Sequence, residues 1–248
     1  MPKFFVDKSQ IFEDIIILSG ENAHHISRSL RMASGEKITV SDMQGFDYDC
    51  VLETFTDNTV NAKIINKYLS KSEPEIKVHL YQALPKGDKL DFIIQKSVEC
   101  GVYDITPFES TNCVVKIKNE AESKKNERRN KISLEAAKQS GRAIIPKVNP
   151  SISFDAMLTN ALKSDVVLFC YEGANTLPLA RVLKSIRANN NLKDVSIVIG
   201  SEGGFTLSEV EKAEKCGFIK IGLGKRILRA ETAAVMALSC LVYEFELE

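Results

Sequence analysis

The last quarter of the chain, residues 195–243, contains two short apolar runs that each end at a glycine-bearing loop. Val195–Ile199 is rich in β-branched residues and stops at Gly200, which is typical of a buried parallel strand. Phe218–Ile221 is a second run of this kind, and two glycines follow it closely. The pattern predicts an α/β domain in which both loops leave the carboxyl ends of two adjacent strands. Ligands bind at that edge of such sheets.

A helix is predicted after each loop. Thr206 and Glu209 have the spacing of a capping box, so one helix begins there and ends near Cys216. Residues 232–241 are apolar or small on nearly every face, which predicts a helix packed against several neighbours. Three cations lie beside the second loop: Lys225, Arg226 and Arg229.

The common nucleotide-binding motifs do not match. The chain lacks G-x-x-x-x-G-K-[ST], and Gly222-Leu223-Gly224 lacks the third glycine of the dinucleotide fingerprint. These observations disfavour a P-loop enzyme and an ordinary dinucleotide-dependent dehydrogenase. The glycines could simply form tight turns without a ligand, but the charged residues Glu202, Arg229 and Glu231 in otherwise apolar loop edges favour a site.

Both loops together resemble one known family. The segment 199–205, IGSEGGF, followed by 222–233, GLGKRILRAETA, is similar to the paired signature of the small-subunit ribosomal RNA uridine-N3 methyltransferases. That family belongs to the SPOUT class of trefoil-knotted methyltransferases. Ser201 and Lys225 stand where the family usually has proline, and Ala230 where it usually has threonine. The loss of two prolines removes preset backbone angles, so it affects loop rigidity more than chemistry.

The resemblance implies two domains. Residues 1–70 would form a small PUA-like β-barrel that binds RNA, and residues 75–248 a SPOUT methyltransferase domain with a mostly parallel sheet and a carboxy-terminal knot. The sequence pattern alone predicts an ordinary doubly wound sheet, because knots are rare. The polar segment 69–75, which contains Pro74, is the expected boundary.

Elements expected before the last quarter follow from apolar periodicity. Strands are expected at 4–6, 15–18, 37–41, 48–55, 60–68, 76–84, 105–108 and 166–171, and helices at 22–30, 88–100, 124–140, 154–162 and 178–188. Strands alternate with helices after residue 75, which indicates a parallel sheet.

The activity that the resemblance implies is transfer of a methyl group from S-adenosyl-L-methionine to N3 of a uridine in the decoding region of 16S ribosomal RNA. The imino proton must leave, so a carboxylate near the cofactor, Glu202 or Glu231, is the candidate base. Arg229 could stabilise charge on the uracil oxygens. The alternative for Glu231 is a structural role, in which its charge complements a helix N-terminus. Arg229 could likewise have no role beyond pairing with a carboxylate. A related methyltransferase acting on another RNA and a non-catalytic RNA-binding protein are the alternatives.

The cofactor pocket is expected where three strand-end loops meet, 169–173, 199–205 and 223–228. Its candidate residues are Phe169, Tyr171, Gly200, Glu202, Gly203, Gly204, Leu223, Gly224, Ile227 and Leu228. Glycine at positions 200 and 204 would leave clearance for the adenine ring.

Six cations are candidate RNA-binding residues: Arg28, Arg31, Lys86, Lys89, Arg142 and Arg226. Gln139-Ser140-Gly141-Arg142 resembles a family motif, with Lys138 in place of a usual glutamate, and such arginines can reach the partner's active site in this class. Asn112 stands where the family has arginine. The run Lys124–Lys131 holds five cations in eight residues, and we interpret it as a solvated face.

Composition limits the remaining possibilities. The formal net charge is zero, so nucleic-acid binding has to come from local patches. The six cysteines form no C-x-x-C pair and are expected to be reduced, and His24 and His25 lack further ligands, so no metal site is expected. The chain lacks an apolar run of membrane-spanning length, and a cytoplasmic location is expected. The resemblance implies a homodimer, in which residues 233–243 would pack against the partner; burial within one subunit would explain their apolar character equally well.

Overall fold

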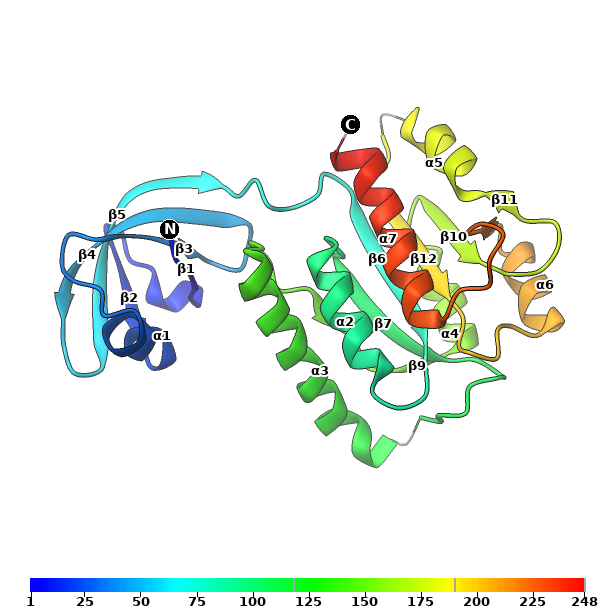
Figure 1. The fold of residues 1–248 in the computed structure, drawn as a ribbon, viewed down its shortest axis with the longest axis horizontal. Helices are drawn as coiled ribbons and strands as arrows, with labels where there is room; N and C mark the ends of the chain where they lie inside the picture. The colour runs from blue at the N-terminus through cyan, green and yellow to red at the C-terminus, as the bar shows by residue number, and fades with distance from the viewer. Residues whose placement is uncertain (118, 190, 248) are drawn as a thin grey trace. The chain divides into compact units, whose positions relative to one another are not determined.

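A computed structural model describes residues 1–117, 119–189 and 191–247. The chain forms two compact units (Figure 1). Unit 1 consists of Met1–Glu73 together with Ala137–Ile145, and unit 2 contains Pro74–Ala136 and the chain from Pro146 onward. The sequence pattern did not predict that residues 137–145 belong to unit 1.

Unit 1 is built on a curled five-stranded sheet with the order β1-β3-β4-β5-β2. The strands are β1 (Lys3–Phe5), β2 (Ile15–Ser19), β3 (Lys37–Ser41), β4 (Phe46–Phe55) and β5 (Thr59–Leu69). Only β1 and β3 pair in parallel among these strands. Successive side chains of a strand point to opposite faces of the sheet, and β3 follows this pattern. Ile38 and Val40 are fully buried in the core, whereas Lys37 is exposed. These five strands lie where apolar alternation placed them.

Helical structure in unit 1 is short. A 3-10 turn, η1, covers Lys8–Gln10, and α1 (Glu21–His24) continues into a π-helical turn, η2 (His25–Ser29). The helix expected at 22–30 is therefore present but changes its hydrogen-bonding pattern halfway. The helical spacing predicts that Ala23, Ile26 and Leu30 share one buried face; Ala23 and Ile26 lie in the core, whereas Leu30 is exposed.

Residues 137–145 are held in unit 1 by Glu73. Its carboxylate accepts hydrogen bonds from the backbone amides of Ala143 (2.7 Å) and Ile144 (3.2 Å) and pairs with the guanidinium of Arg142 (2.5 Å). Lys3 adds a hydrogen bond from its Nζ to the carbonyl of Gly141 at 2.8 Å. The segment is therefore an integral part of unit 1.

Unit 2 contains an eight-stranded sheet with the order β11-β13-β10-β12-β6-β7-β8, and β9 also pairs with β7. The strands are β6 (Lys77–Ala83), β7 (Asp104–Glu109), β8 (Lys147–Val148), β9 (Ile152–Ser153), β10 (Val166–Cys170), β11 (Leu177–Pro178), β12 (Asp194–Ile199) and β13 (Ile219–Gly222). Neighbouring strands pair in parallel, as predicted. The expectation that β12 and β13 are adjacent is wrong, because β10 lies between them and bonds to both.

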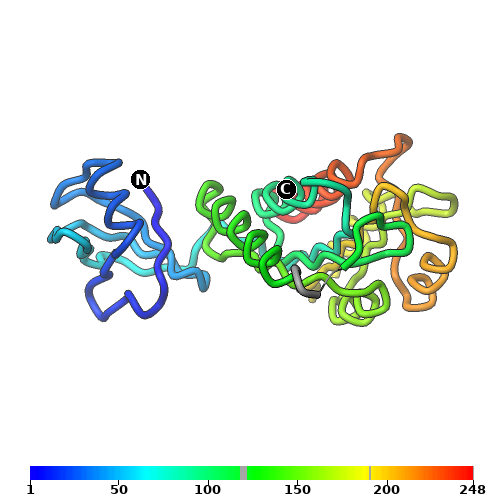
Figure 2. Tube along the Cα trace, turned by 90° about the horizontal axis from the view of Figure 1, so that it is seen from below, coloured from blue at the N-terminus to red at the C-terminus, as the bar shows by residue number. Residues whose placement is uncertain are grey.

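The helices of unit 2 follow the local sequence signals. They are α2 (Lys89–Glu99), α3 (Asn119–Ser140, whose end enters unit 1), α4 (Phe154–Ala161), α5 (Leu179–Arg187), α6 (Leu207–Lys215) and α7 (Ala230–Glu246). The predicted capping box is present at α6, where Thr206 and Glu209 bond reciprocally. Figures 1 and 2 both place α2 beside α7.

One face of helix α7 is buried within its own chain. Ala234, Ala237, Leu238 and Leu241 are shielded from solvent, whereas Tyr243 is exposed. Packing inside one subunit thus accounts for much of the apolar pattern at 233–243. In the described part of the chain, no helix is long and apolar enough to cross a membrane.

Candidate functional site

A cavity of about 430 Å³ opens at the carboxyl edge of the central strands of unit 2. Because β10, β12 and β13 run in parallel, the loops that follow them meet there. These loops supply the lining: residues 170–173 and Thr176 after β10, 199–202 after β12, and 222–230 with Ala233 after β13. The cavity therefore lies where the three predicted loops converge.

An aromatic cluster supports the loop after β12. The Phe205 ring lies 4.3 Å from that of Phe169 and stacks on Phe108 at 6.3 Å with an interplanar angle of 3°. A Cβ added at Gly200 would lie 3.1 Å from the Phe205 ring. The clearance predicted at Gly200 is thus occupied by a protein side chain, and Phe169, which is buried, lies behind the cavity lining.

Gly204 takes a left-handed conformation with φ of +60°. A Cβ at this position would overlap Oε1 of Glu172, so the side chain that follows β10 closes over the loop that follows β12. Glu172 lines the cavity, whereas Gly203 and Gly204 do not. Here too, the space that glycine leaves is filled by the protein.

Glu202 lines the cavity and is held by the loop after β6 and by the first residue of α2. Its Oε1 accepts hydrogen bonds from Nζ of Lys89 at 2.6 Å and from the backbone amide of Lys86 at 3.2 Å. Burial opposes the charged form, but these hydrogen bonds outweigh it and hold the pKa of Glu202 below its ordinary value. The carboxylate is therefore charged near neutrality.

One departure from the family pattern, Asn112, has a structural role. Asn112 donates a hydrogen bond from Nδ2 to the carbonyl of Gly203 at 2.9 Å, so it holds the glycine loop in place. Ser201 is buried at the cavity wall, and its hydroxyl has no hydrogen-bond partner among the described residues. Lys225, the third departure near the site, is exposed on the cavity rim.

The amino terminus of α7 contributes Arg229 and Glu231. Arg229 is the residue preceding the helix, is exposed and lines the cavity. Glu231 lies in the first turn and outside the cavity lining. Its Oε2 is enclosed and has no hydrogen-bond partner in the described part of the chain. The two residues therefore differ sharply in their access to a bound substrate.

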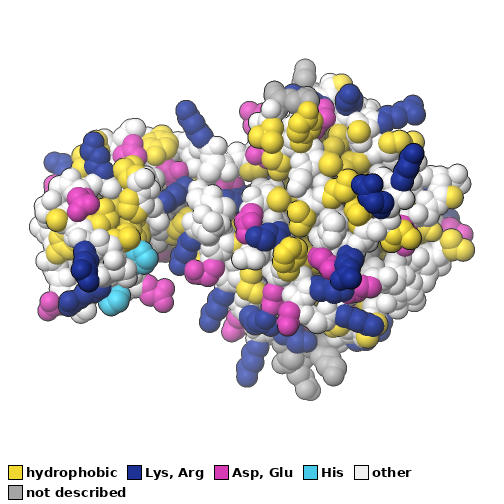
Figure 3. Space-filling view, viewed as in Figure 1, with side chains coloured by type: hydrophobic (Ala, Val, Ile, Leu, Met, Phe, Trp, Pro, Cys, Tyr) yellow, Lys and Arg dark blue, Asp and Glu magenta, His cyan; other side chains and the backbone are white. Residues whose placement is uncertain are grey.

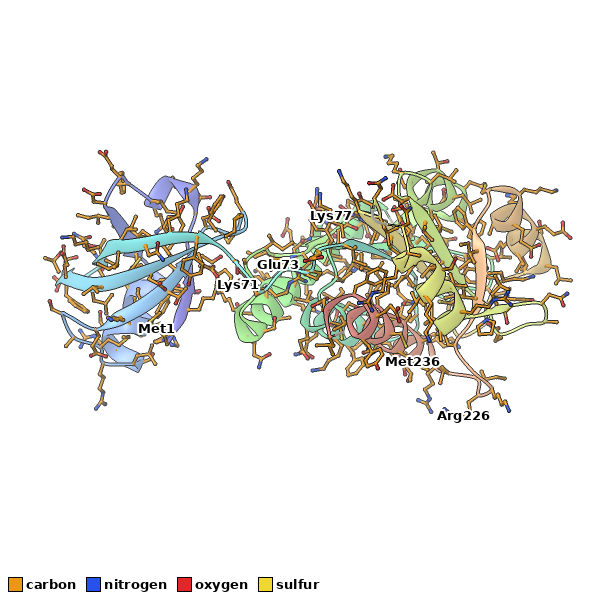
Figure 4. The ribbon with its side chains drawn as sticks, turned by 90° about the horizontal axis from the view of Figure 1, so that it is seen from above. Met1, Lys71, Glu73, Lys77, Arg226 and Met236 are labelled. Carbon is orange, nitrogen blue, oxygen red and sulfur yellow. The ribbon has the colours of Figure 1, made fainter. Side chains whose placement is uncertain are left out.

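The remaining candidates either line the cavity or lie in unit 1. Tyr171, Leu223, Gly224, Leu228, Ile227 and Arg226 line the cavity. Arg226 projects from the loop after β13 (Figure 4), and Ile227 is 86% exposed, so this part of the loop faces solvent. In unit 1, Arg28 and Arg31 are exposed.

Arg142 does not face solvent. The residue is 3% exposed, and its guanidinium pairs with Glu73, so it stabilises residues 137–145. The motif suggested an RNA contact, but the acidic partner lies too far away in sequence to be recognised by spacing.

Glu172 and Ser201 lie within the predicted loops 169–173 and 199–205 but were not among the candidate residues, and Thr176 lies outside the predicted loops. Glu172 had a detectable signal, because it directly follows a buried strand at the ligand-binding edge. Thr176 had none, since its position depends on β11 pairing with β13. No group of three or more metal-ligating side chains is present in the part of the chain that the structure describes.

Comparison with known proteins identifies the family. A family model described as an RNA methyltransferase domain matches residues 72–242, and one described as an RNA methyltransferase PUA domain matches residues 18–65. The chain belongs to this family of RNA methyltransferases. The predicted fold class, a mostly parallel α/β domain after a PUA-like domain, is thereby confirmed.

Relatives extend the similarity over the whole methyltransferase. The Bacillus subtilis protein named Ribosomal RNA small subunit methyltransferase E is 36% identical over 254 residues, which cover 100% of this chain and 98% of the relative. A protein of the same name from Mesomycoplasma hyopneumoniae is 37% identical over 239 residues, with 96% and 98% covered. The crystal structure of the Neisseria gonorrhoeae protein of that name, bound to S-adenosyl methionine, superimposes with a TM-score of 0.81 at 28% identity, covering 98% of this chain and 97% of that one.

Proposed function

We propose that this methyltransferase transfers the methyl group of S-adenosyl-L-methionine to N3 of a uridine in the decoding region of 16S ribosomal RNA. The observation that carries the proposal is the cavity formed by three strand-end loops, in a chain similar over its full length to small-subunit methyltransferases. The S-adenosyl methionine bound to the Neisseria gonorrhoeae relative supports the choice of cofactor.

The cavity fits a ligand of this size. Its volume of about 430 Å³ lies within the roughly 300–1,000 Å³ of small-molecule sites. Leu223 and Leu228 supply apolar side chains, and the backbone groups of Gly200 and residues 223–228 would bind the adenine edge. When bound, the cofactor supplies an electrophilic methyl group on a sulfonium centre. The protein's task is then to hold the uridine nitrogen in line with that group.

The uridine must also lose its N3 proton, and the two candidate carboxylates differ. Glu202 lines the cavity, but its hydrogen bonds to Lys86 and Lys89 lower its pKa and so make it a weaker base. Glu231 has an oxygen without a partner in the described structure, but that oxygen is enclosed. We assign the role of general base to Glu202 because it lines the cavity. Glu231, in the first turn of α7, would stabilise the amino terminus of that helix.

A comparison of two variants tests this assignment. Glu202→Gln is expected to lower turnover by about 10²–10⁴-fold, the usual contribution of a general base. Glu231→Gln is expected to leave turnover within about tenfold. The opposite ranking would transfer the role to Glu231.

Arg229 is the proposed donor to the uracil oxygens, because it lines the rim and is exposed. Arg229→Ala should leave S-adenosyl-L-methionine binding near normal in calorimetry and lower turnover by about a hundredfold. Arg181→Ala, which removes an exposed arginine on α5, is the control. Unchanged turnover would remove Arg229 from the catalytic residues.

The substrate is tested by nucleoside analysis of ribosomal RNA from cells lacking the protein. Loss of 3-methyluridine from 16S ribosomal RNA, restored by the wild-type chain, is the expected result. Loss of a different modified nucleoside would assign the chain to another reaction of the class. Failure to bind the cofactor would indicate a non-catalytic RNA-binding protein.

The same proposal includes a cytoplasmic homodimer with the small-subunit RNA as partner, and the trefoil knot of the SPOUT class. Exposed apolar side chains on the adjacent helices α2 and α7, Phe92 at 46% and Tyr243 at 57%, support a subunit contact. Figure 3 shows yellow side chains on the front of unit 2, where Figure 1 draws these helices. Light scattering that gives the mass of one chain would refute the dimer.

A further inference from the structure

The cation run Lys124–Lys131 lies outside the cofactor cavity and the RNA-binding residues considered above. It occupies the part of α3 that belongs to unit 2. Two of its cations have structural partners. Arg129 is buried and pairs with Glu122 at 2.7 Å, and Arg128 forms an ion pair with Asp91 of α2.

The other three cations are not used in this way. Lys124, Lys125 and Lys131 are exposed, and among the described side chains none of the three has a carboxylate partner. One acid, Glu127, interrupts the run. Lys124 and Lys131 lie seven residues apart, which is about 10.5 Å along a helix at 1.5 Å per residue.

A second cavity of about 140 Å³ lies between α2 and α3, and we call it the α2–α3 cavity. Lys125, Arg128 and Arg129 of α3 line one side, and Gly87 and Asp88 of the loop after β6 line the other. Gly87 has open space where a side chain would be, so the loop backbone is accessible from outside.

One loop connects this cavity to the cofactor cavity. Gly87 lies in the α2–α3 cavity, while its neighbours Lys86 and Lys89 hold Glu202, which lines the cofactor cavity. Within unit 2, Lys125 therefore shares a cavity with the residues after β6 whose neighbours bind Glu202 of the cofactor cavity. Figure 3 shows blue side chains, interspersed with magenta ones, in the region where Figure 1 draws α3.

We propose that Lys124, Lys125 and Lys131, together with the α2–α3 cavity, bind the phosphate backbone of the substrate RNA and that the Lys86–Lys89 loop leads this strand to the cofactor cavity. The inference rests on the proposed function. A chain with zero formal net charge depends on local cations to bind a polyanion, and these three exposed lysines have no carboxylate partner among the described side chains.

The expected effect is electrostatic. Each lysine–phosphate contact contributes about 0.7–0.9 to the slope of log affinity against log salt concentration, so three contacts contribute about 2–3. At 1 M salt these contacts contribute nothing, so the variant and the wild-type chain should bind equally. At 0.1 M salt the loss of three contacts should then lower the affinity about a hundredfold.

The test compares two triple variants of the full-length chain in filter binding to a 16S ribosomal RNA transcript across a potassium chloride series. The test variant is Lys124→Gln/Lys125→Gln/Lys131→Gln. The control is Arg181→Gln/Lys184→Gln/Lys215→Gln, which removes exposed cations from α5 and α6. The test variant should lower the slope by about 2–3 and weaken binding about a hundredfold at 0.1 M salt, while the control keeps the wild-type slope.

Cofactor binding separates this inference from the proposed function. The test variant should bind S-adenosyl-L-methionine within twofold of wild type and melt at the same temperature. Equal slopes for the two triple variants would overturn the inference while leaving the proposed function intact. The inference would also be overturned if the test variant bound naked RNA as tightly as wild type but lost activity on assembled subunits. That result would assign the lysines to a protein partner. A wild-type chain that binds neither transcript nor cofactor would refute both.

Discussion

Gly204→Ala is expected to destabilise unit 2 by about 1.5–3.5 kcal/mol. The φ of +60° places the residue in the left-handed region, which costs a side chain about 1–2 kcal/mol. The added Cβ would also overlap Oε1 of Glu172, and displacing that flexible side chain from its preferred rotamer costs of the order of 0.5–1.5 kcal/mol.

Gly87→Ala is a matched control for this change. Gly87 has nearly the same φ, +63°, and also belongs to unit 2, but no described atom lies within 4 Å of the added Cβ. It should cost about 1–2 kcal/mol, so the difference of about 1 kcal/mol isolates the contact with Glu172. Both substitutions restrict the unfolded chain equally, and this contribution cancels.

The assay is urea denaturation followed by circular dichroism, together with calorimetric titration of S-adenosyl-L-methionine. Adding Glu172→Ala should remove the difference between the two glycine variants. Because Glu172 lines the cavity, Gly204→Ala should also weaken cofactor binding by about fivefold, the equivalent of roughly 1 kcal/mol. Equal stabilities for the two single variants, with unchanged cofactor binding, would show that Glu172 does not close over the glycine loop.

Two further predictions concern ion pairs. His79 contacts Asp104 at 3.1 Å and Asp194 at 3.0 Å; burial lowers its pKa, but the two carboxylates outweigh burial and raise it above the ordinary value. Its stabilising contribution should therefore be complete below about pH 6.5 and be lost as pH rises through the folded-state pKa, and His79→Gln should remove this pH dependence from unfolding measured between pH 6 and 9. Glu73→Gln, which removes the negative charge that pairs with the buried Arg142, should destabilise unit 1 by about 3 kcal/mol in urea denaturation, and a cost below 1 kcal/mol would contradict this account.

Features of the fold that depend on neighbouring residues could be read from the sequence. The capping box at Thr206 and Glu209 fixes the start of α6 because its hydrogen bonds span three residues. Apolar alternation likewise located the longer strands of both units, whereas the two-residue strands β8, β9 and β11 were not predicted. The two paired glycine motifs indicated the family, and the family model confirms it.

Features that depend on distant residues could not be read in this way. Apolar periodicity does not specify strand order, so the position of β10 between β12 and β13 was missed. The role of Arg142 depends on Glu73, which lies far away in the sequence. Likewise, the space left by Gly204 could be recognised as useful, but not that Glu172 would fill it.

The return of residues 137–145 to unit 1 has a consequence for biosynthesis. A chain emerging from the ribosome presents all five strands of the amino-terminal sheet well before it presents the segment that Glu73 binds. Vectorial synthesis usually lets an amino-terminal domain fold first. Here the first unit remains incomplete until much of the second has been translated, and a protein truncated after Glu73 would keep that acceptor without its amide donors from Ala143 and Ile144.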